Sequence, residues 1–238
     1  MRIGLYFGSF NPIHIGHLII ANHIINNTGL ERLWFVVSPQ NPFKKSGSLL
    51  NEYHRLHLVN SAIDGETKLK SSNVEFKLPR PSYTIDTLTY LSEKYPQHQF
   101  AIVMGSDGFM NLEGWKNYKT LVKNYSFFIY NRPGFLITDT LGADVTILNA
   151  PLLDISSSLI RTMIKEKKSI RFLVPDSVKD EIESNVSSVL KAEIVGDRED
   201  AIEILIDPVC QENYNLVLDQ VIQKFAMNNQ IVPAGNLE

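Results

Sequence analysis

The sequence has very little cysteine, no long hydrophobic run and no marked excess of charge. Cys210 is the single cysteine among 238 residues, so the chain can form neither an internal disulfide nor a thiolate zinc cluster. No apolar stretch approaches the roughly 20 residues that a membrane span needs, and residues 2–8 resemble a short strand rather than a signal peptide. We therefore expect a cytoplasmic protein without a membrane segment.

The charge is almost balanced, with 23 Lys and Arg against 26 Asp and Glu and a formal net charge of -3. A global field that would attract nucleic acid or anionic lipid is therefore missing, and we expect no nucleic-acid partner. A local pocket for phosphate is still compatible with this balance. The 44% of hydrophobic residues is typical of a globular chain, and the length predicts one large domain, alone or with an appendage.

Short apolar runs alternate with segments of helical periodicity over the first 150 residues. The runs that predict strands are 2–7, 33–37, 74–78, 100–104, 127–130 and 145–148, and the segments that predict helices are 15–27, 52–63 and 83–95. Parallel strands need crossover helices, so the alternation predicts an α/β fold: a doubly wound, Rossmann-like parallel sheet with helices on both faces. Ligands of such sheets bind at the carboxyl ends of the strands, here in the loops after Phe7, Val37 and Met104.

The pattern weakens after about residue 186. Residues 202–206 predict a strand, and residues 214–227 predict a helix with one apolar face. We therefore divide the chain into a catalytic domain over 1–186 and a C-terminal extension over 187–238, whose role and structure the sequence does not indicate.

Residues 8–17, G-S-F-N-P-I-H-I-G-H, connect the first strand to the first helix. Glycines allow close approach of a ligand to the backbone, and a helix N-terminus attracts an anion, so this turn is a candidate phosphate site. His14 and His17 are three residues apart and would face the same side. The turn lacks the spacing of a P-loop or of a dinucleotide fingerprint, and no third metal ligand is nearby. The alternative interpretation is that His14 caps a turn and His17 packs under the sheet.

Residues 154–161, D-I-S-S-S-L-I-R, predict a second anion-binding helix start. The serines can cap a helix or bind a phosphate with their hydroxyl groups, and Arg161 follows one turn later with a planar set of donors. Such a segment, taken alone, is more often a capped helix with a solvent-facing arginine. The presence of two candidate anion sites in one chain favours the anion-binding interpretation over that of a capped helix.

These two segments together resemble the HxGH and ISSxxxR signatures of the nucleotidylyltransferase superfamily. In addition, the order of R-P-S-Y-T-I-D-T-L (80–88), G-S-D (105–107), Trp115 and R-P-G (132–134) is similar to bacterial nicotinate-mononucleotide adenylyltransferases. The likeness covers roughly residues 1–186. Asn11 departs from it, since the family commonly has Asp at this position of the turn.

The resemblance implies adenylyl transfer from ATP to nicotinate mononucleotide, which yields deamido-NAD and pyrophosphate, with Mg²⁺ bound largely through the phosphates of ATP. The acceptor is a phosphate monoester with a second pKa of about 6, so it is already an anionic nucleophile and needs no general base. The enzyme has to align two polyanions and to stabilise charge on the transferred group and on the leaving pyrophosphate. A homo-oligomer remains open.

The resemblance also assigns roles to residues. His14 would orient an ATP phosphate, His17 would donate to the α-phosphoryl oxygens, and Arg161 would hold the β- and γ-phosphates. Further ATP-binding positions would be Gly8, Ser9, Phe10, Gly16, Gly105, Asp107, Ser156 and Ser157. The carboxylate of Asp107 is a candidate acceptor for the ribose hydroxyls, although a helix cap is an equally good interpretation of this residue alone.

For the acceptor, the resemblance implies that Tyr83 and Thr84 offer backbone N–H groups to the pyridine carboxylate and that Trp115 stacks on the ring. Lys44 and Arg132 are candidates for binding the acceptor phosphate. Two alternatives remain open: the same chemistry on nicotinamide mononucleotide, and a non-catalytic nucleotide sensor whose C-terminal segment engages a protein.

Overall fold

The computed structural model describes residues 1–39 and 49–189. The chain divides into two compact units, Met1–Glu183 and Ser184–Glu238. Lys44 and the strand and helix expected at 202–206 and 214–227 lie outside the described residues. Within the described part of the chain, no helix is long and apolar enough to cross a membrane.

The first unit is built on a six-stranded sheet in which every pair of neighbours is parallel, in the order β3-β2-β1-β4-β5-β6. The strands are β1 (Arg2–Gly8), β2 (Arg32–Val37), β3 (Leu69–Ser72), β4 (Gln99–Gly105), β5 (Ser126–Tyr130) and β6 (Asp144–Leu148). This order is that of a doubly wound sheet, so the expected fold class is confirmed. The winding reverses between β1 and β4, and such a switch point opens a crevice at the carboxyl ends of the strands.

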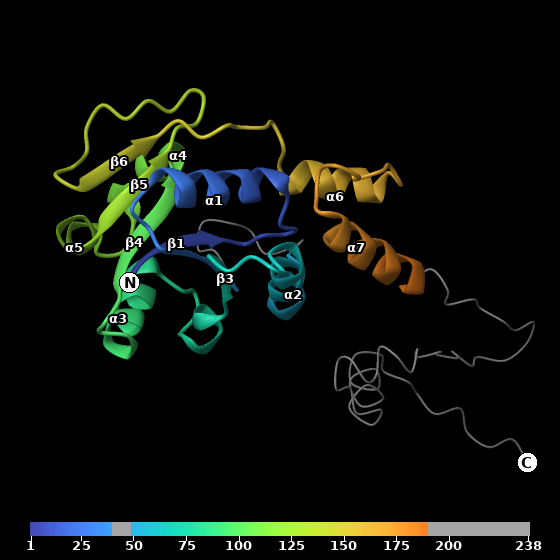
Figure 1. Cartoon of the computed structure of the whole chain (residues 1–238), viewed down its shortest axis with the longest axis horizontal. Helices are drawn as coiled ribbons and strands as arrows, with labels where there is room; N and C mark the ends of the chain where they lie inside the picture. The colour runs from blue at the N-terminus through green and yellow to red at the C-terminus, as the bar shows by residue number, and fades with distance from the viewer. Residues whose placement is uncertain (40–48, 190–238) are drawn as a thin grey trace, which may run out of the picture. The chain divides into compact units, whose positions relative to one another are not determined.

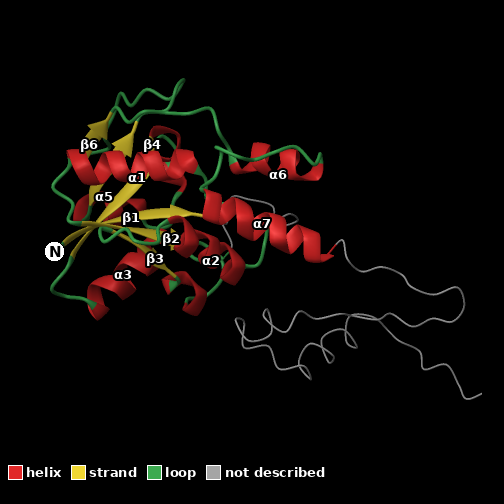
Figure 2. Ribbon diagram, turned by 45° about the vertical axis from the view of Figure 1, so that its right-hand side comes forward, coloured by secondary structure: helices red, strands yellow, loops and turns green. Residues whose placement is uncertain are grey.

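Helices cover both faces of this sheet (Figures 1 and 2). The helices of the described residues are α1 (Ile15–Asn27), α2 (Glu52–Ala62), α3 (Thr84–Lys94), α4 (Ser106–Phe109), α5 (Tyr118–Asn124), α6 (Ser157–Lys165) and α7 (Asp176–Val189), with 3-10 turns η1 (Val74–Lys77) and η2 (Leu112–Gly114). Because side chains alternate along a strand, successive residues of one strand enter different cores. Phe35 of β2 packs in the core with α1 and α2, whereas its neighbours Trp34 and Val36 pack in the core with α3 and α5.

The strand expected over residues 74–78 is wrong. These residues form the 3-10 turn η1, and the strand of this region is β3, which begins at Leu69. β3 lies at the edge of the sheet and pairs only with β2, so its L-K-S-S sequence needs no apolar run. The apolar side chains that suggested a strand serve the turn instead: Val74 is buried in one core and Phe76 packs against the other.

The end of β1 is shaped by a glycine. A Cβ atom at Gly8 would lie 2.7 Å from the ring of Phe10, so only glycine lets this ring fold back over the strand. Phe10 is buried and has a φ of 43°, in the left-handed region that non-glycine residues seldom occupy. The turn between β1 and α1 is therefore held in one uncommon conformation at the carboxyl edge of the sheet.

Candidate active site

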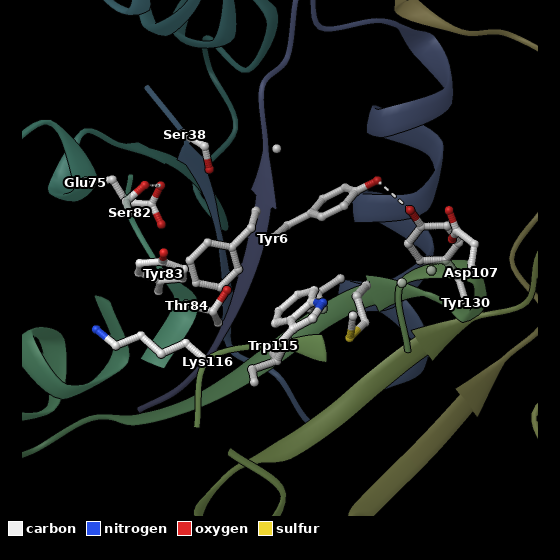
Figure 3. A pocket seen from close by; sticks show the side chains of 17 residues that line it. Tyr6, Ser38, Glu75, Ser82, Tyr83, Thr84, Asp107, Trp115, Lys116 and Tyr130 are labelled. Atoms are coloured by element: carbon white, nitrogen blue, oxygen red, sulfur yellow. Dashed lines mark hydrogen bonds between the residues drawn. The ribbon is translucent and has the colours of Figure 1, made fainter. Parts of the chain in front are cut away.

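Two adjoining cavities open at the carboxyl edge of the sheet. The larger cavity has a volume of about 920 Å³ and the smaller cavity about 270 Å³. Both are lined by Tyr6, Phe7 and Gly8 at the end of β1 and by Tyr130 at the end of β5. The hydroxyl groups of Tyr6 and Tyr130 are hydrogen-bonded at 3.2 Å (Figure 3). This pair of tyrosines lies where the two cavities meet.

The residues singled out from the sequence separate between the two cavities. The larger cavity is lined by Gly8, Ser9, Phe10, His14, Gly16, His17, Arg132, Ser156, Ser157 and Arg161. The smaller cavity is lined by Gly8, Tyr83, Thr84, Gly105, Asp107 and Trp115. Lys44 lies outside the described residues.

The two histidines of the first turn lie side by side in the larger cavity. Their ring centroids are 3.7 Å apart with 32° between the ring planes. The backbone N–H of His14 donates to Nδ1 of His17 at 3.3 Å. In a neutral imidazole this bond places the proton on Nε2, which makes that nitrogen of His17 a hydrogen-bond donor. The ring of His17 also packs edge-on against Phe10, with centroids 5.1 Å apart.

His14 is the N-cap residue of α1 and is 6% exposed. Burial, followed by the positive charge of Arg132, lowers the pKa of His14 to about 4, so the ring is neutral near pH 7. Its Nδ1 atom is buried and has no hydrogen-bond partner among the described residues. A buried polar atom without a partner costs free energy, which a ligand in the cavity could recover. His14 is thus both the N-cap residue of α1 and part of the wall of the larger cavity.

The third component, Arg161, reaches the first turn from a helix about 150 residues further along the chain. Its Nη1 donates to the carbonyl oxygen of Asn11 at 2.7 Å and its Nη2 to the hydroxyl of Ser158 at 3.2 Å. The hydroxyl of Ser157 donates to the carbonyl oxygen of Pro12 at 2.9 Å, while Ser156 caps α6 by accepting from the N–H of Leu159. The start of α6 is thus fastened to the turn that carries the histidines.

Asp107 and Arg132 face each other where the cavities adjoin. Asp107 lines the smaller cavity and Arg132 the larger one, with 3.3 Å between the carboxylate and Nε. The N-cap of α4 is Gly105, so Asp107 is not the cap residue of this helix. A Cβ atom at Gly105 would clash with the Asp107 carboxylate and come within 3.1 Å of Arg132, so the ion pair requires glycine here.

The smaller cavity combines an aromatic side chain with an open helix start. Trp115 is half-buried, and Lys116 next to it binds Asp86 at 2.8 Å and lies 4.8 Å from the ring centroid of Tyr83 (Figure 3). Tyr83 is the N-cap of α3 but makes no side-chain cap bond. The N–H groups in the first turn of a helix have no partner within the helix, so this end can bind an anion.

Sequence reasoning missed two buried charges beside the cavities. Arg55 is 0% exposed and donates to four carbonyl oxygens: those of Ser9 at 2.6 Å, Ser38 at 2.8 Å, Leu50 at 2.8 Å and Pro39 at 3.3 Å. Burial lowers the pKa of Arg55 to about 10, and nearby Glu52 opposes this shift, so the guanidinium is charged at pH 7. Arg55 joins the loop of the larger cavity, through Ser9, to that of the smaller one, through Ser38.

Glu75 is the second missed charge. It is 2% exposed, lines the smaller cavity and accepts from the hydroxyl groups of Ser82 and Thr87. Burial raises its pKa, and hydrogen bonds from Ser82, Ser38 and Thr87 work in the opposite direction. Glu75 lies in the strand expected over residues 74–78, where a charged side chain normally faces solvent, so no local signal could reveal its burial.

A parallel sheet of this order, with histidine and arginine side chains in a cavity at its switch point, defines a doubly wound α/β protein. The cytidylyltransferase-like family model matches residues 5–163, so the chain belongs to that family. Two proteins named "Probable nicotinate-nucleotide adenylyltransferase" are 49% identical over 184 residues. The alignment with the Cytophaga hutchinsonii protein covers 94% of that protein and 76% of this chain. The alignment with the Flavobacterium psychrophilum protein covers 94% of that protein and 75% of this chain. Within the family, the chain therefore belongs with the nicotinate-nucleotide adenylyltransferases.

A solved structure supports the fold. The Plasmodium falciparum nicotinic acid mononucleotide adenylyltransferase complexed with NaAD matches with a TM-score of 0.66 at 23% identity, over 77% of this chain and 95% of that chain.

Proposed function

We propose that the protein transfers the adenylyl group of ATP to nicotinate mononucleotide and releases deamido-NAD and pyrophosphate. The observation that carries this proposal is the convergence of His14, His17 and Arg161 on one cavity that adjoins a second, aromatic cavity at the end of β1. Two cavities that meet at one strand end suit a reaction in which two nucleotides must be joined. The two bacterial relatives reported above are named for this reaction, which supports the proposal.

The reaction needs alignment and charge stabilisation rather than a base. An oxygen of the acceptor phosphate attacks the α-phosphorus of ATP, and the bond from that phosphorus to the bridging oxygen of pyrophosphate breaks. With a second pKa of about 6, the acceptor phosphate is already anionic at pH 7. The protein therefore contributes by holding both polyanions in line and by donating hydrogen bonds to the charge that develops.

The larger cavity supplies the donors. The Nε2–H of His17 would donate to an α-phosphoryl oxygen, and the neutral ring of His14 would orient a phosphate of ATP without adding charge. Arg161 would hold the β- and γ-phosphates together with the turn at Ser156 and Ser157. The bond from Arg161 to the carbonyl of Asn11 keeps this guanidinium next to the histidine turn.

The donor set fits Mg²⁺ that enters with ATP. Asp154 is the one carboxylate among the described residues lining the larger cavity, and nowhere in residues 1–39 and 49–189 do three or more His, Cys, Asp or Glu side chains cluster to hold a metal. The ion would therefore be held chiefly by phosphate oxygens, with Asp154 the nearest protein candidate. When bound, it neutralises charge on the triphosphate.

The smaller cavity would take the acceptor. The pyridine ring would stack on Trp115, and its carboxylate would accept from the N–H groups of Tyr83 and Thr84 at the start of α3. Asp107 would accept from a ribose hydroxyl of ATP, and Arg132 would bind the acceptor phosphate across the boundary. Binding of that phosphate by Lys44 stays a prediction, as do a cytoplasmic location, a homo-oligomer and the lack of a nucleic-acid partner.

The test is a rate comparison. Purified protein with ATP and Mg²⁺ is supplied with nicotinate or nicotinamide mononucleotide, and pyrophosphate and the dinucleotide product are measured. We expect turnover with both and a clear preference for nicotinate mononucleotide. A preference for the amide would change the acceptor, while calorimetric binding of ATP without any product would replace the enzyme by a nucleotide sensor.

A further inference from the structure

Glu75 is a buried carboxylate that the proposed chemistry does not use. Among the described residues, no Lys, Arg or His lies within ion-pair distance of it. Burying a carboxylate without a cation is costly unless hydrogen bonds replace its hydration shell. Glu75 nevertheless lies in the wall of the smaller cavity, where hydroxyl groups bind its carboxylate.

The two oxygens of Glu75 bind the start of α3 at two points. Oε2 accepts from the hydroxyl of Ser82 at 2.7 Å, and Oε1 accepts from the hydroxyl of Thr87 at 3.0 Å. Ser82 directly precedes the N-cap residue Tyr83, and Thr87 lies one turn into the helix. The carboxylate therefore spans the first turn from one end to the other, next to the smaller cavity (Figure 3).

Glu75 also reaches a second wall of the same cavity. Ser38, just after β2, lines the same cavity, and its side chain contributes a hydrogen bond that lowers the pKa of the Glu75 carboxyl. Ser38 itself is held by Arg55, which donates to its carbonyl oxygen at 2.8 Å. The loop after β2 and the first turn of α3 are thus joined through one carboxylate, and both line the smaller cavity.

We propose that Glu75 is a positioning residue for acceptor selectivity: by holding Ser82 and Thr87 it aims the N–H groups of Tyr83 and Thr84 at the carboxylate of a pyridine mononucleotide. The proposal rests on the function proposed above. N–H groups at the start of a helix have no partner within that helix, and the direction of those of Tyr83 and Thr84 depends on the first turn that Glu75 braces.

The selectivity follows from hydrogen-bond chemistry. A carboxylate offers an acceptor oxygen to each of two N–H donors, whereas an amide offers one oxygen and turns its NH₂ group toward the second donor. A site built for two acceptors leaves buried donors unpaired when the amide binds. A shift of the turn by a few tenths of an ångström removes the advantage of the carboxylate and changes the binding of the amide much less.

Glu75→Gln tests this, because it keeps the size of the side chain and replaces one acceptor by a donor. We expect KM for nicotinate mononucleotide to rise about tenfold, KM for ATP to stay within twofold, and the ratio of kcat/KM for nicotinate over nicotinamide mononucleotide to fall about tenfold. This ratio does not depend on the fraction of folded enzyme, so a merely structural defect leaves it unchanged. An unchanged ratio overturns the proposal.

Asp144→Asn is the matched control. Asp144 also accepts from a serine hydroxyl, that of Ser126 at 2.6 Å, but it lines neither cavity. We expect this variant to keep the wild-type ratio. A fall as large as that of Glu75→Gln would make the effect nonspecific and would overturn the proposal.

Two milder variants keep the test open if Glu75→Gln does not fold. Ser82→Ala and Thr87→Val each remove one hydroxyl from the carboxylate, and each should lower the ratio by about threefold. A wild-type protein without turnover on either mononucleotide means that the proposed function fails. Calorimetric dissociation constants of the two mononucleotides then decide the inference, which is overturned if Glu75→Gln keeps the wild-type preference.

Discussion

The two cavities offer an anion different kinds of partner. The larger cavity presents side chains, with His14, His17 and Arg161 mounted on two helix starts that are fastened to each other. The smaller cavity presents mainly the backbone of an uncapped helix start beside Trp115. Side-chain donors can change rotamer and keep their hydrogen bonds while the geometry of a phosphate group changes during the reaction. Backbone N–H donors at a helix start have a fixed direction, so they favour a ligand of one shape. We therefore propose that bond making takes place in the larger cavity and that the smaller cavity selects the acceptor.

The largest effect expected from this comparison is that of His17→Ala. Removing one preorganised donor to the developing charge costs about a hundredfold to a thousandfold in kcat. KM for nicotinate mononucleotide should change by less than threefold, because the acceptor occupies the other cavity. Steady-state kinetics with varied ATP and varied acceptor separates the two constants.

His23→Ala is the control for this experiment. His23 lies on the same helix, binds Asn27 and lines neither cavity. It should retain wild-type kcat. Equal losses in both variants would show that α1 as a whole, and not the donor at His17, supports turnover.

The opposite pattern is expected for Trp115→Leu. Stacking on an aromatic ring contributes about 0.5–1.5 kcal/mol beyond the area that it buries, so KM for the acceptor should rise about tenfold. The kcat at saturating acceptor and KM for ATP should stay within threefold of the wild type. A loss confined to kcat would mean that the division of labour between the cavities is wrong.

The last effect concerns stability rather than turnover, and it follows from the burial of His14. The folded pKa of His14 is about 4 against 6.5 for an ordinary histidine, so the unfolded chain binds more protons between these values. His14 therefore lowers the free energy of unfolding as pH falls from 6.5 toward 4, by about 2 kcal/mol between pH 7 and 5.

Urea denaturation of the ligand-free protein at both pH values measures this term, and His14→Gln should reduce the pH dependence by that amount. The same variant at pH 7 should lose little stability, since the ring is neutral there. An unaltered pH dependence would contradict the burial of an uncharged imidazole.

The elements around the site differ in how well the sequence predicts them. The predicted bounds of α1, Ile15–Asn27, agree with the structure because the glycine-containing turn after β1 precedes the helix and Gly29 follows its end. β3 was missed because an edge strand with one neighbour carries no apolar run, and the alternation of the following turn imitated one. Local patterns thus predict the elements whose burial is decided locally.

The charged residues beside the cavities could not be predicted in the same way. Arg55 lies on a predicted helix and Glu75 in a predicted strand, and in both places a charged residue normally faces solvent. Their burial is decided by partners far along the chain, such as the carbonyl of Ser9 for Arg55 and the hydroxyl of Thr87 for Glu75. The ion pair of Asp107 and Arg132 is a further example, because the sequence placed its members with different substrates.

The sharing of Tyr6, Phe7 and Gly8 by both cavities limits how this enzyme could be redesigned or could diverge. A substitution in that common wall changes the shape of both cavities, so it would alter the binding of both substrates together. If the smaller cavity binds the acceptor, as we propose, a change of acceptor requires substitutions in Trp115, in the loop after β2 or in the first turn of α3, which line that cavity.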